Sequence, residues 1–309
     1  ISTVSIEENG PAVALGPGKI PYVSPPGIRR DKEYGSSSTS RLQNEQSLRL
    51  SVTRLRDGYA KGAYKNITIN MLRYKRLRLF LHGDSEDENT RDGDVQAFIR
   101  IGTDYTQNFY QYALPLQLTK PGETGPDQVW KPENRIDVTF QDFIDAKAER
   151  NQRNPVNYQI PYTKTLANGA TITVLGNPDF STVQGVMIGM LNPSTPNDPS
   201  PKTVNLWADE FRVFDFEQQA GYAATARLNV KLADVANITA TGSFTSVGFG
   251  GLQDKVQQRS IDDVFRGDLN ATVAAEPNMS QLKPLPLELP PTMLVKSEYT
   301  CGLLNSTNR

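Results

Sequence analysis

The clearest structural signal in this sequence is the run Ala224-Thr225-Ala226-Arg227-Leu228-Asn229-Val230-Lys231-Leu232. Apolar side chains occupy every second position, and polar or charged side chains fill the positions between them. Successive side chains of a β-strand point to opposite faces, so the run predicts a strand with one apolar and one polar face. Its length, about ten residues, is that of a tilted strand that crosses a membrane.

The same alternation returns twice further along the chain. The apolar positions of these two segments are Ile238, Ala240, Gly242 and Phe244, and then Leu269, Ala271 and Val273. Residues 217–275 are therefore predicted to form antiparallel strands. The pattern of each segment is weak evidence taken alone, so two interpretations stay open: the wall of a transmembrane β-barrel, or an ordinary hairpin that faces solvent.

Residues 47–216 are also predicted to be mainly strands. Leu48, Leu50 and Val52 alternate with polar residues, and similar runs recur between clusters of turn residues. The further predicted strands are 63–69, 77–81, 94–101, 109–118, 171–175, 183–191 and 203–216. Several strands at this spacing, with little helical pattern between them, predict a jelly-roll-like β-sandwich over residues 47–216.

One helix is predicted within this sandwich. Thr139 is suited to cap its start, and Pro155 closes the segment. Helical spacing places four apolar side chains on one face: Phe140, Phe143, Ile144 and Ala148. We expect the helix to cover the open end of a sheet.

The two ends of the chain differ from its middle. Residues 1–46 are broken by glycine and proline and predict an extended arm or linker, or an arm that packs along another part of a larger assembly. Residues 276–309 form a proline-rich tail, suited to a polyproline-type arm or a linker. Because the chain begins at Ile1, we expect it to be a piece of a longer protein.

Composition narrows the range of functions. The net charge of the 309 residues is -1, which argues against nucleic acid as a partner. Cys301 is the single cysteine and His82 the single histidine, which excludes a disulfide framework, cysteine-cluster metal sites and multi-histidine zinc sites. No apolar run approaches about 18 residues, so no transmembrane helix is expected.

The residues that could carry chemistry form no catalytic set. The segment Asp84–Asp94 is rich in carboxylates, which suit calcium, but its spacing does not match an EF-hand and favours a solvated hairpin tip. His82 stands beside this segment and is expected to be structural. Asp209 and Glu210 are adjacent on a strand and should point to opposite faces. We therefore expect no enzyme activity and no catalytic, cofactor-binding or metal-binding residue.

Several ordered strings resemble one family. They include Tyr74-Lys75-Arg76-Leu77-Arg78-Leu79-Phe80-Leu81-His82-Gly83 and Asp92-Gly93-Asp94-Val95-Gln96-Ala97-Phe98-Ile99-Arg100-Ile101-Gly102-Thr103-Asp104-Tyr105-Thr106. Leu206-Trp207-Ala208-Asp209-Glu210-Phe211-Arg212-Val213 and the hairpin that begins at Gly221 match as well. Together they resemble the SprA/Sov family, from about residue 20 to residue 275. Its members are very large outer-membrane translocons of the type IX secretion system in Bacteroidota, linked also to gliding motility.

This resemblance implies transport across the cell outer membrane. The parent protein would form a barrel of about 36 strands and pass folded cargo that bears a C-terminal secretion signal. At ~14 residues per strand and turn, 309 residues are only part of such a barrel. The implied partners are secreted cargo proteins, a smaller outer-membrane shuttle barrel, a periplasmic plug protein, membrane lipid and the rest of the parent barrel.

Two alternatives compete with transport. A carbohydrate-binding jelly-roll module would use Tyr105, Tyr110, Tyr112 or Trp207 as a stacking platform for sugars. Burial of Trp207 between sheets would weigh strongly against that module. A glycoside hydrolase would need two opposed carboxylates ~5–9 Å apart across a cleft.

Overall fold

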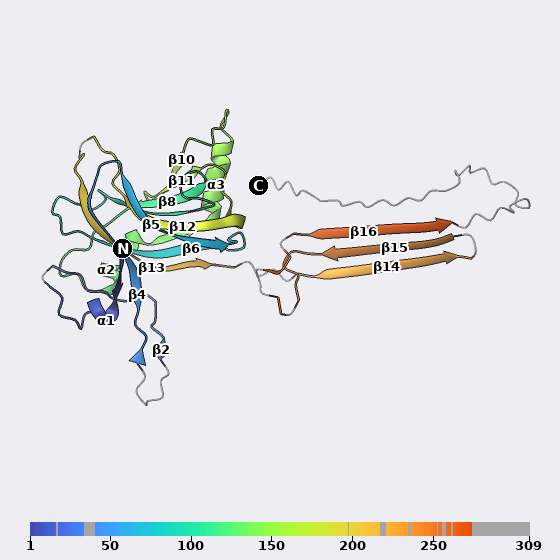
Figure 1. Cartoon of the computed structure of the whole chain (residues 1–309), viewed down its shortest axis with the longest axis horizontal. Helices are drawn as coiled ribbons and strands as arrows, with labels where there is room; N and C mark the ends of the chain where they lie inside the picture. The colour runs from blue at the N-terminus through green and yellow to red at the C-terminus, as the bar shows by residue number, and fades with distance from the viewer. Residues whose placement is uncertain are drawn as a thin grey trace, which may run out of the picture. The chain divides into compact units, whose positions relative to one another are not determined.

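The computed structural model describes residues 1–16, 18–33, 41–196, 198–216, 221–233, 236–251, 253–254, 258–260 and 262–273. It divides the chain into two compact units, Ile1–Glu217 and Gln218–Arg309 (Figure 1). Cys301 and the proline-rich tail predicted over 276–309 lie outside the described residues.

The first unit contains two antiparallel sheets. The five-stranded sheet has the order β1 (Ser2–Ser5), β4 (Gln46–Leu55), β13 (Lys202–Phe214), β6 (Arg76–Asp84) and β9 (Ile136–Thr139). The six-stranded sheet has the order β10 (Tyr162–Thr165), β11 (Thr171–Leu175), β8 (Phe109–Pro115), β7 (Gln96–Gly102), β12 (Val183–Leu191) and β5 (Ala60–Ile69). The short elements are α1 (Ile6–Asn9), α2 (Pro126–Val129), two 3₁₀ turns (Pro132–Asn134 and Phe180–Thr182) and the ribbon β2 (Lys32–Glu33) and β3 (Arg41–Leu42).

Strand order identifies the sandwich as jelly-roll-like. In chain order its main strands are β4, β5, β6, β7, β8, β9, β12 and β13. When these strands are numbered one to eight, their order is 1-8-3-6 in the five-stranded sheet and 2-7-4-5 in the six-stranded sheet. Most connections cross from one sheet to the other, so the first and last strands become neighbours, as in a double Greek key. The predicted mainly β fold is confirmed, and the four-residue helices α1 and α2 accompany the one helix that was predicted.

The main core lies between the two sheets. Leu77, Leu79 and Leu81 of β6 alternate toward it, and Ile99 and Ile101 of β7 meet them from the other sheet. Phe80, which lies between Leu79 and Leu81, points outward and belongs to a second apolar cluster. The period of two along each strand thus divides the side chains of the five-stranded sheet between two cores.

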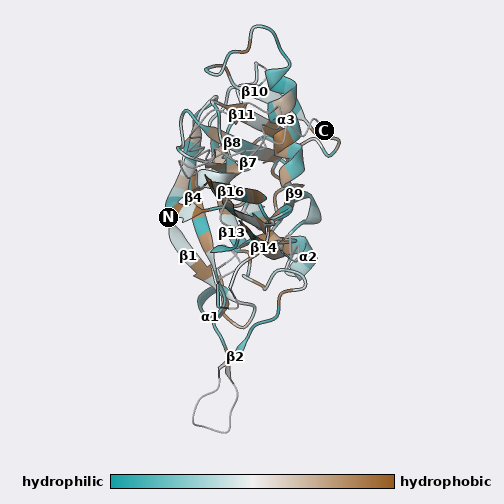
Figure 2. Ribbon diagram, turned by 90° about the vertical axis from the view of Figure 1, so that its right-hand side faces the viewer, coloured by the Kyte–Doolittle hydropathy of each residue, from teal (hydrophilic) through white to brown (hydrophobic). Residues whose placement is uncertain are grey.

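The predicted helix is α3 (Phe140–Asn151), and its start is confirmed. The Thr139 hydroxyl accepts the amide proton of Asp142, whose carboxylate accepts the Thr139 amide in return. The predicted apolar face is only half right, because Ile144, which is 42% exposed, and Ala148 both lie at the surface. Polar and apolar residues alternate along α3 (Figure 2). The buried side chains are Phe140, Phe143, Ala146 and Arg150.

Tertiary contacts explain the rotation of α3. The rings of Phe140 and Phe143 lie 4.7 and 5.8 Å from the ring of Phe180. At the other end of the helix, the buried Arg150 guanidinium donates to the carbonyl of Gly176. These anchors turn Ile144 toward solvent.

The described segments within residues 1–46, predicted as an extended arm or linker or as an arm packed along a larger assembly, are integrated into the sandwich. β1 pairs with the first half of β4, from Ser2 opposite Arg49 to Ser5 opposite Gln46. Val4 and Tyr22 are buried in the second cluster. The outer face of the five-stranded sheet carries large apolar side chains, and this segment removes them from water.

The second unit contains one three-stranded antiparallel sheet, β14 (Ala223–Leu232), β15 (Ala236–Thr245) and β16 (Val264–Val273). Both pairings run through all ten residues without a register shift. None of the helices in the described ranges is long and apolar enough to cross a membrane.

Candidate functional site

The sheet of the second unit has one wholly apolar face. Its register aligns Leu228 with Ala240, and Ala240 with Leu269, at mid-strand. The fifteen side-chain positions on this face are Ala224, Ala226, Leu228, Val230, Leu232, Ala236, Ile238, Ala240, Gly242, Phe244, Phe265, Gly267, Leu269, Ala271 and Val273. No polar or charged residue interrupts them.

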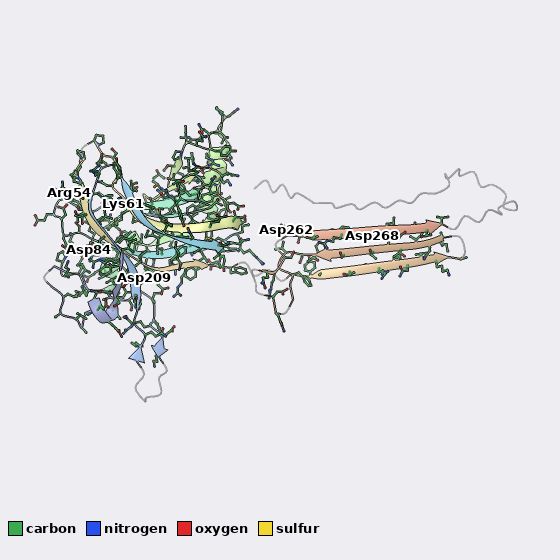
Figure 3. All side chains as sticks on the ribbon, viewed as in Figure 1. Arg54, Lys61, Asp84, Asp209, Asp262 and Asp268 are labelled. Atoms are coloured by element: carbon green, nitrogen blue, oxygen red, sulfur yellow. The ribbon has the colours of Figure 1, made fainter. Side chains whose placement is uncertain are left out.

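The opposite face is polar. Arg227, Thr241 and Asp268 form one cross-strand row, and Asp268 is labelled on β16 in Figure 3. The two apolar exceptions, Ala223 and Val264, flank Thr245 in the row at one end. The two faces of the sheet therefore differ in polarity over the full length of its strands.

The apolar face is exposed. Leu228, Phe265 and Leu269 are each more than half accessible to solvent. Contiguous exposed apolar surface of this kind marks a site that contacts a protein or a membrane. Ten residues at ~3.4 Å each, tilted by ~45°, span about 24 Å, close to the ~25 Å apolar band of outer-membrane barrels.

A second set of candidate residues lies on the outer face of the five-stranded sheet. His82 is fully buried, and its ring lies 3.9 Å from that of Trp207 and 6.1 Å from that of Trp130. Its Nδ1 atom is 2.8 Å from the Val129 carbonyl, and its Nε2 atom is 3.2 Å from Asp84. Both ring nitrogens are engaged within the protein, which suits a structural role.

The carboxylate of Asp84 lies beside His82 and forms hydrogen bonds with polar side chains of two strands. Burial disfavours its charged form, but hydrogen bonds with His82 and Asn205 outweigh that effect and lower the pKa of the carboxyl group. The Asn205 amide donates to Asp84 over 2.9 Å. The carboxylate thus belongs to the cluster that joins β6 to β13.

The N-terminal strap, residues 20–28, covers the same cluster. The Tyr22 hydroxyl donates to Asp209 over 2.6 Å, and the Trp130 indole donates to the Val23 carbonyl over 2.6 Å. Asp209 and Asp84 are labelled in Figure 3. Burial, above all, raises the pKa of Asp209 to about 6. Sequence reasoning missed Tyr22, because the strap has no periodic pattern.

The two adjacent carboxylates of β13, Asp209 and Glu210, are engaged by different residues. A β-bulge follows Asp209, and Glu210 adopts a left-handed conformation with φ of 53°. Asp209 accepts from Tyr22, whereas Glu210 forms an ion pair with Arg212. Each carboxylate is occupied by a partner from the protein.

The acidic segment Asp84–Asp94 is not a hairpin tip, contrary to prediction. β6 and β7, which it joins, belong to different sheets. The buried Lys202 ammonium anchors the segment through Asp94 at 2.7 Å and also contacts Asp198 at 2.6 Å. No group of three or more histidine, cysteine or acidic side chains suited to a metal occurs among the described residues.

The aromatic platform expected for a carbohydrate-binding module does not form as predicted. Tyr110 and Tyr112 are buried in the main core, and Trp207 is buried beneath the N-terminal strap. Tyr105 is the one residue of the four that reaches the surface. Inward-facing strand positions hide Tyr110 and Tyr112, and the N-terminal strap covers Trp207. The burial of Trp207 weighs against that module.

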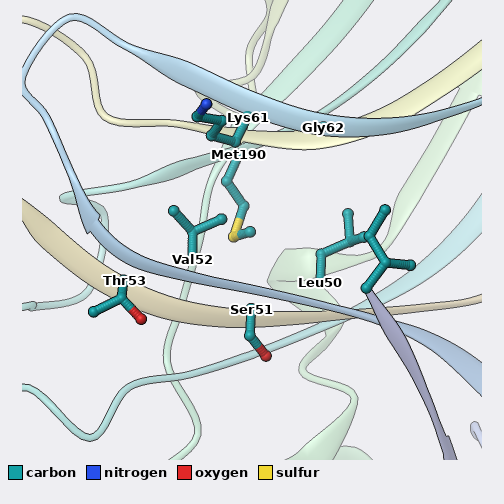
Figure 4. A pocket seen from close by; sticks show the side chains of 8 residues that line it. Leu50, Ser51, Val52, Thr53, Lys61, Gly62 and Met190 are labelled. Atoms are coloured by element: carbon teal, nitrogen blue, oxygen red, sulfur yellow. The ribbon is translucent and has the colours of Figure 1, made fainter.

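A cleft of about 320 Å³ opens at the edge of the sandwich (Figure 4). Leu50 and Val52 of β4 lie on one side of it, and Lys61 and Met190 lie on the other. Because β1 pairs only with residues 46–49, it leaves this part of β4 uncovered.

A family model described as motility related/secretion protein (SprA_N) matches residues 1–287. The chain belongs to this family. The match confirms the resemblance to the SprA/Sov family and includes both the sandwich and the three-stranded sheet of this SprA-family chain. None of the curated proteins compared with it matches the chain.

Proposed function

We propose that this SprA-family chain is part of an outer-membrane translocon of the type IX secretion system. The translocon passes folded cargo with a C-terminal secretion signal to the cell surface. Membership of a motility and secretion family supports this role. The observation that carries it is the uninterrupted apolar face of β14, β15 and β16.

In this proposal the three strands are part of a barrel wall. The apolar face meets lipid, and the face with Arg227 and Lys231 meets the water-filled lumen. β14 and β16 are the edges of the described sheet, so each has backbone groups free to pair with another strand. Further strands of the parent barrel would satisfy these groups, as a membrane requires.

The other components of the proposal follow from the same role. The partners are secreted cargo, a smaller outer-membrane shuttle barrel, a periplasmic plug protein and membrane lipid. The role requires no catalysis, cofactor or metal, and the near-neutral net charge does not favour nucleic acid.

A pair of substitutions in the full-length parent tests the barrel wall. Leu228→Arg places a cation at mid-strand on the apolar face, and Asn229→Arg places the same cation on the polar face. In lipid, the first should cost ~2–4 kcal/mol and the second little. The measurement is the yield of membrane-inserted parent protein.

We expect Leu228→Arg to reduce this yield and Asn229→Arg to leave it near normal. Equal tolerance of both variants would reject the barrel wall and favour a sheet that faces water. Equal sensitivity would also reject it, because the polar face would then be buried.

A further inference from the structure

A polar cavity of about 390 Å³ lies where β5 and β7 end and β12 begins on the six-stranded sheet. Its lining consists of Asn66, Ile67, Thr68, Thr103, Tyr105 and Gln184. Two amides, two hydroxyls and a phenol are thus present, and no charged side chain contributes. A ligand that fits this lining is uncharged and rich in hydrogen-bonding groups.

An exposed aromatic surface adjoins the cavity. The Tyr64 and Tyr105 rings have centroids 4.8 Å apart at an interplanar angle of 45°. Tyr64 is 63% exposed, although it stands in the middle of a strand. A large, rigid ring left open beside a cavity offers a flat apolar face at low entropic cost.

Tyr105 is held in place through both its side chain and its backbone. Its hydroxyl donates to the Asn66 side chain over 2.8 Å, and its backbone carbonyl accepts from the Arg100 guanidinium. Its tip rests on Gly185, where an added Cβ atom would lie 2.1 Å from the phenol oxygen. The close approach of Tyr105 to β12 therefore requires glycine at this position.

The loop that carries Tyr105 is equally constrained. Asp104 accepts the backbone amides of Thr106, Gln107 and Asn108 over 2.8, 2.5 and 3.0 Å. Burial opposes ionisation of Asp104, but these hydrogen bonds prevail and lower its pKa to about 2. The Arg100 guanidinium, also bound to Gln111, lies 3.8 Å above the Phe109 ring. The site is therefore formed before any ligand arrives.

We propose that this cavity, with Tyr64 and Tyr105, binds a neutral saccharide. A sugar ring presents C–H groups that pack on an aromatic face and hydroxyls that pair with amides. Within the described part of the chain, the side chains of Thr68, Thr103 and Gln184 have no hydrogen-bond partner, so they are available to such hydroxyls. The volume accommodates one or two sugar units. This site is separate from the three-stranded sheet and does not depend on the translocon proposal.

Isothermal titration of the full chain in detergent tests the site. The probes are neutral gluco-, xylo- and manno-oligosaccharides, with an acidic oligogalacturonide and an unstructured tyrosine-containing peptide as comparisons. At least one neutral probe should bind below ~10 mM. Tyr64→Ala should weaken this binding about tenfold or more. Tyr59→Ala, which alters another exposed tyrosine, should not change it.

Gly185→Ala provides a second, independent variant. The methyl group displaces only the far end of Tyr105, so the fold should persist while saccharide binding falls as it does for Tyr64→Ala. Absence of binding by every neutral probe would overturn the proposal. So would unchanged binding by both variants, or preferential binding of the acidic probe or the peptide.

Discussion

Asp209 is a carboxyl group that folding places beneath a tyrosine. Burial first, and then the neighbouring Glu45 and Glu210 charges, outweigh the Tyr22 hydrogen bond and raise its pKa to about 6. A carboxyl group whose pKa is higher in the folded chain than in the unfolded chain contributes its full stabilisation at pH values below the unfolded pKa, 3.8. This stabilisation is lost as the pH rises through the folded pKa of about 6. The free energy of unfolding should therefore fall across this window.

Asp209→Asn should remove this pH dependence. The amide oxygen still accepts from Tyr22, and no charge has to be buried. From pH 4 to pH 7, the free energy of unfolding should fall by ~1–3 kcal/mol less in the variant than in the unsubstituted chain. Urea unfolding at several pH values measures this difference. Asp145→Asn on the solvent side of α3 is the control, and an identical profile for both variants would contradict the prediction.

α3 shows how an element acquires its orientation. Spacing alone permits either Ile144 or Ala146 to face the sheet, because Ile144 lies four positions after Phe140 and Ala146 lies three positions after Phe143. The Phe180 ring and the Gly176 carbonyl decide between them. The contacts come from residues more than 25 positions away, which no local pattern contains.

The orientation of α3 predicts unequal costs for neighbouring residues. Phe143→Ala empties a buried site and should cost ~3–5 kcal/mol. Ile144→Ala affects an exposed side chain and should cost less than ~1 kcal/mol. Thermal unfolding of both variants measures the ratio. Comparable costs would show that Ile144 faces the core after all.

The N-terminus of α3 provides a separate prediction. Thr139→Ala removes the hydroxyl that accepts the Asp142 amide and should lower the free energy of unfolding by ~1 kcal/mol. Thr139→Ser retains the hydroxyl and should restore most of it. A neutral effect of the alanine variant would mean that the cap contributes nothing.

At the scale of the molecule, the two units bury apolar residues differently. The sandwich encloses its apolar side chains in two clusters, whereas the three-stranded sheet leaves one face open. Replacing Leu228, Phe265 and Leu269 together by serine should therefore reduce flotation of the chain with lipid vesicles. Replacing Thr225, Thr241 and Asn270 by serine, on the polar face, should not. Equal flotation of both triple variants would show that the apolar face does not contact lipid.

Sequence alone determined the strands and the two faces of the sheet over 223–273. Alternation is a property of neighbouring residues, and each of these strands pairs with the next along the chain, so local order was sufficient. The same reasoning located most strands of the sandwich and the start of α3, whose cap is also local. It located neither β1, β9 nor β10, because four residues are too few to show a period.

Tertiary structure alone decided the rest. Pairing of β4 with β13 joins residues about 150 positions apart, and pairing of β6 with β13 rather than β7 makes the acidic segment a crossing between sheets. The N-terminal strap covers Trp207 and buries it, whereas only the loop that carries Tyr105 lies beside Tyr64, which stays exposed. Alternation along a strand predicts that the strand has two faces. The distant segment that covers each face is decided by packing across the whole chain.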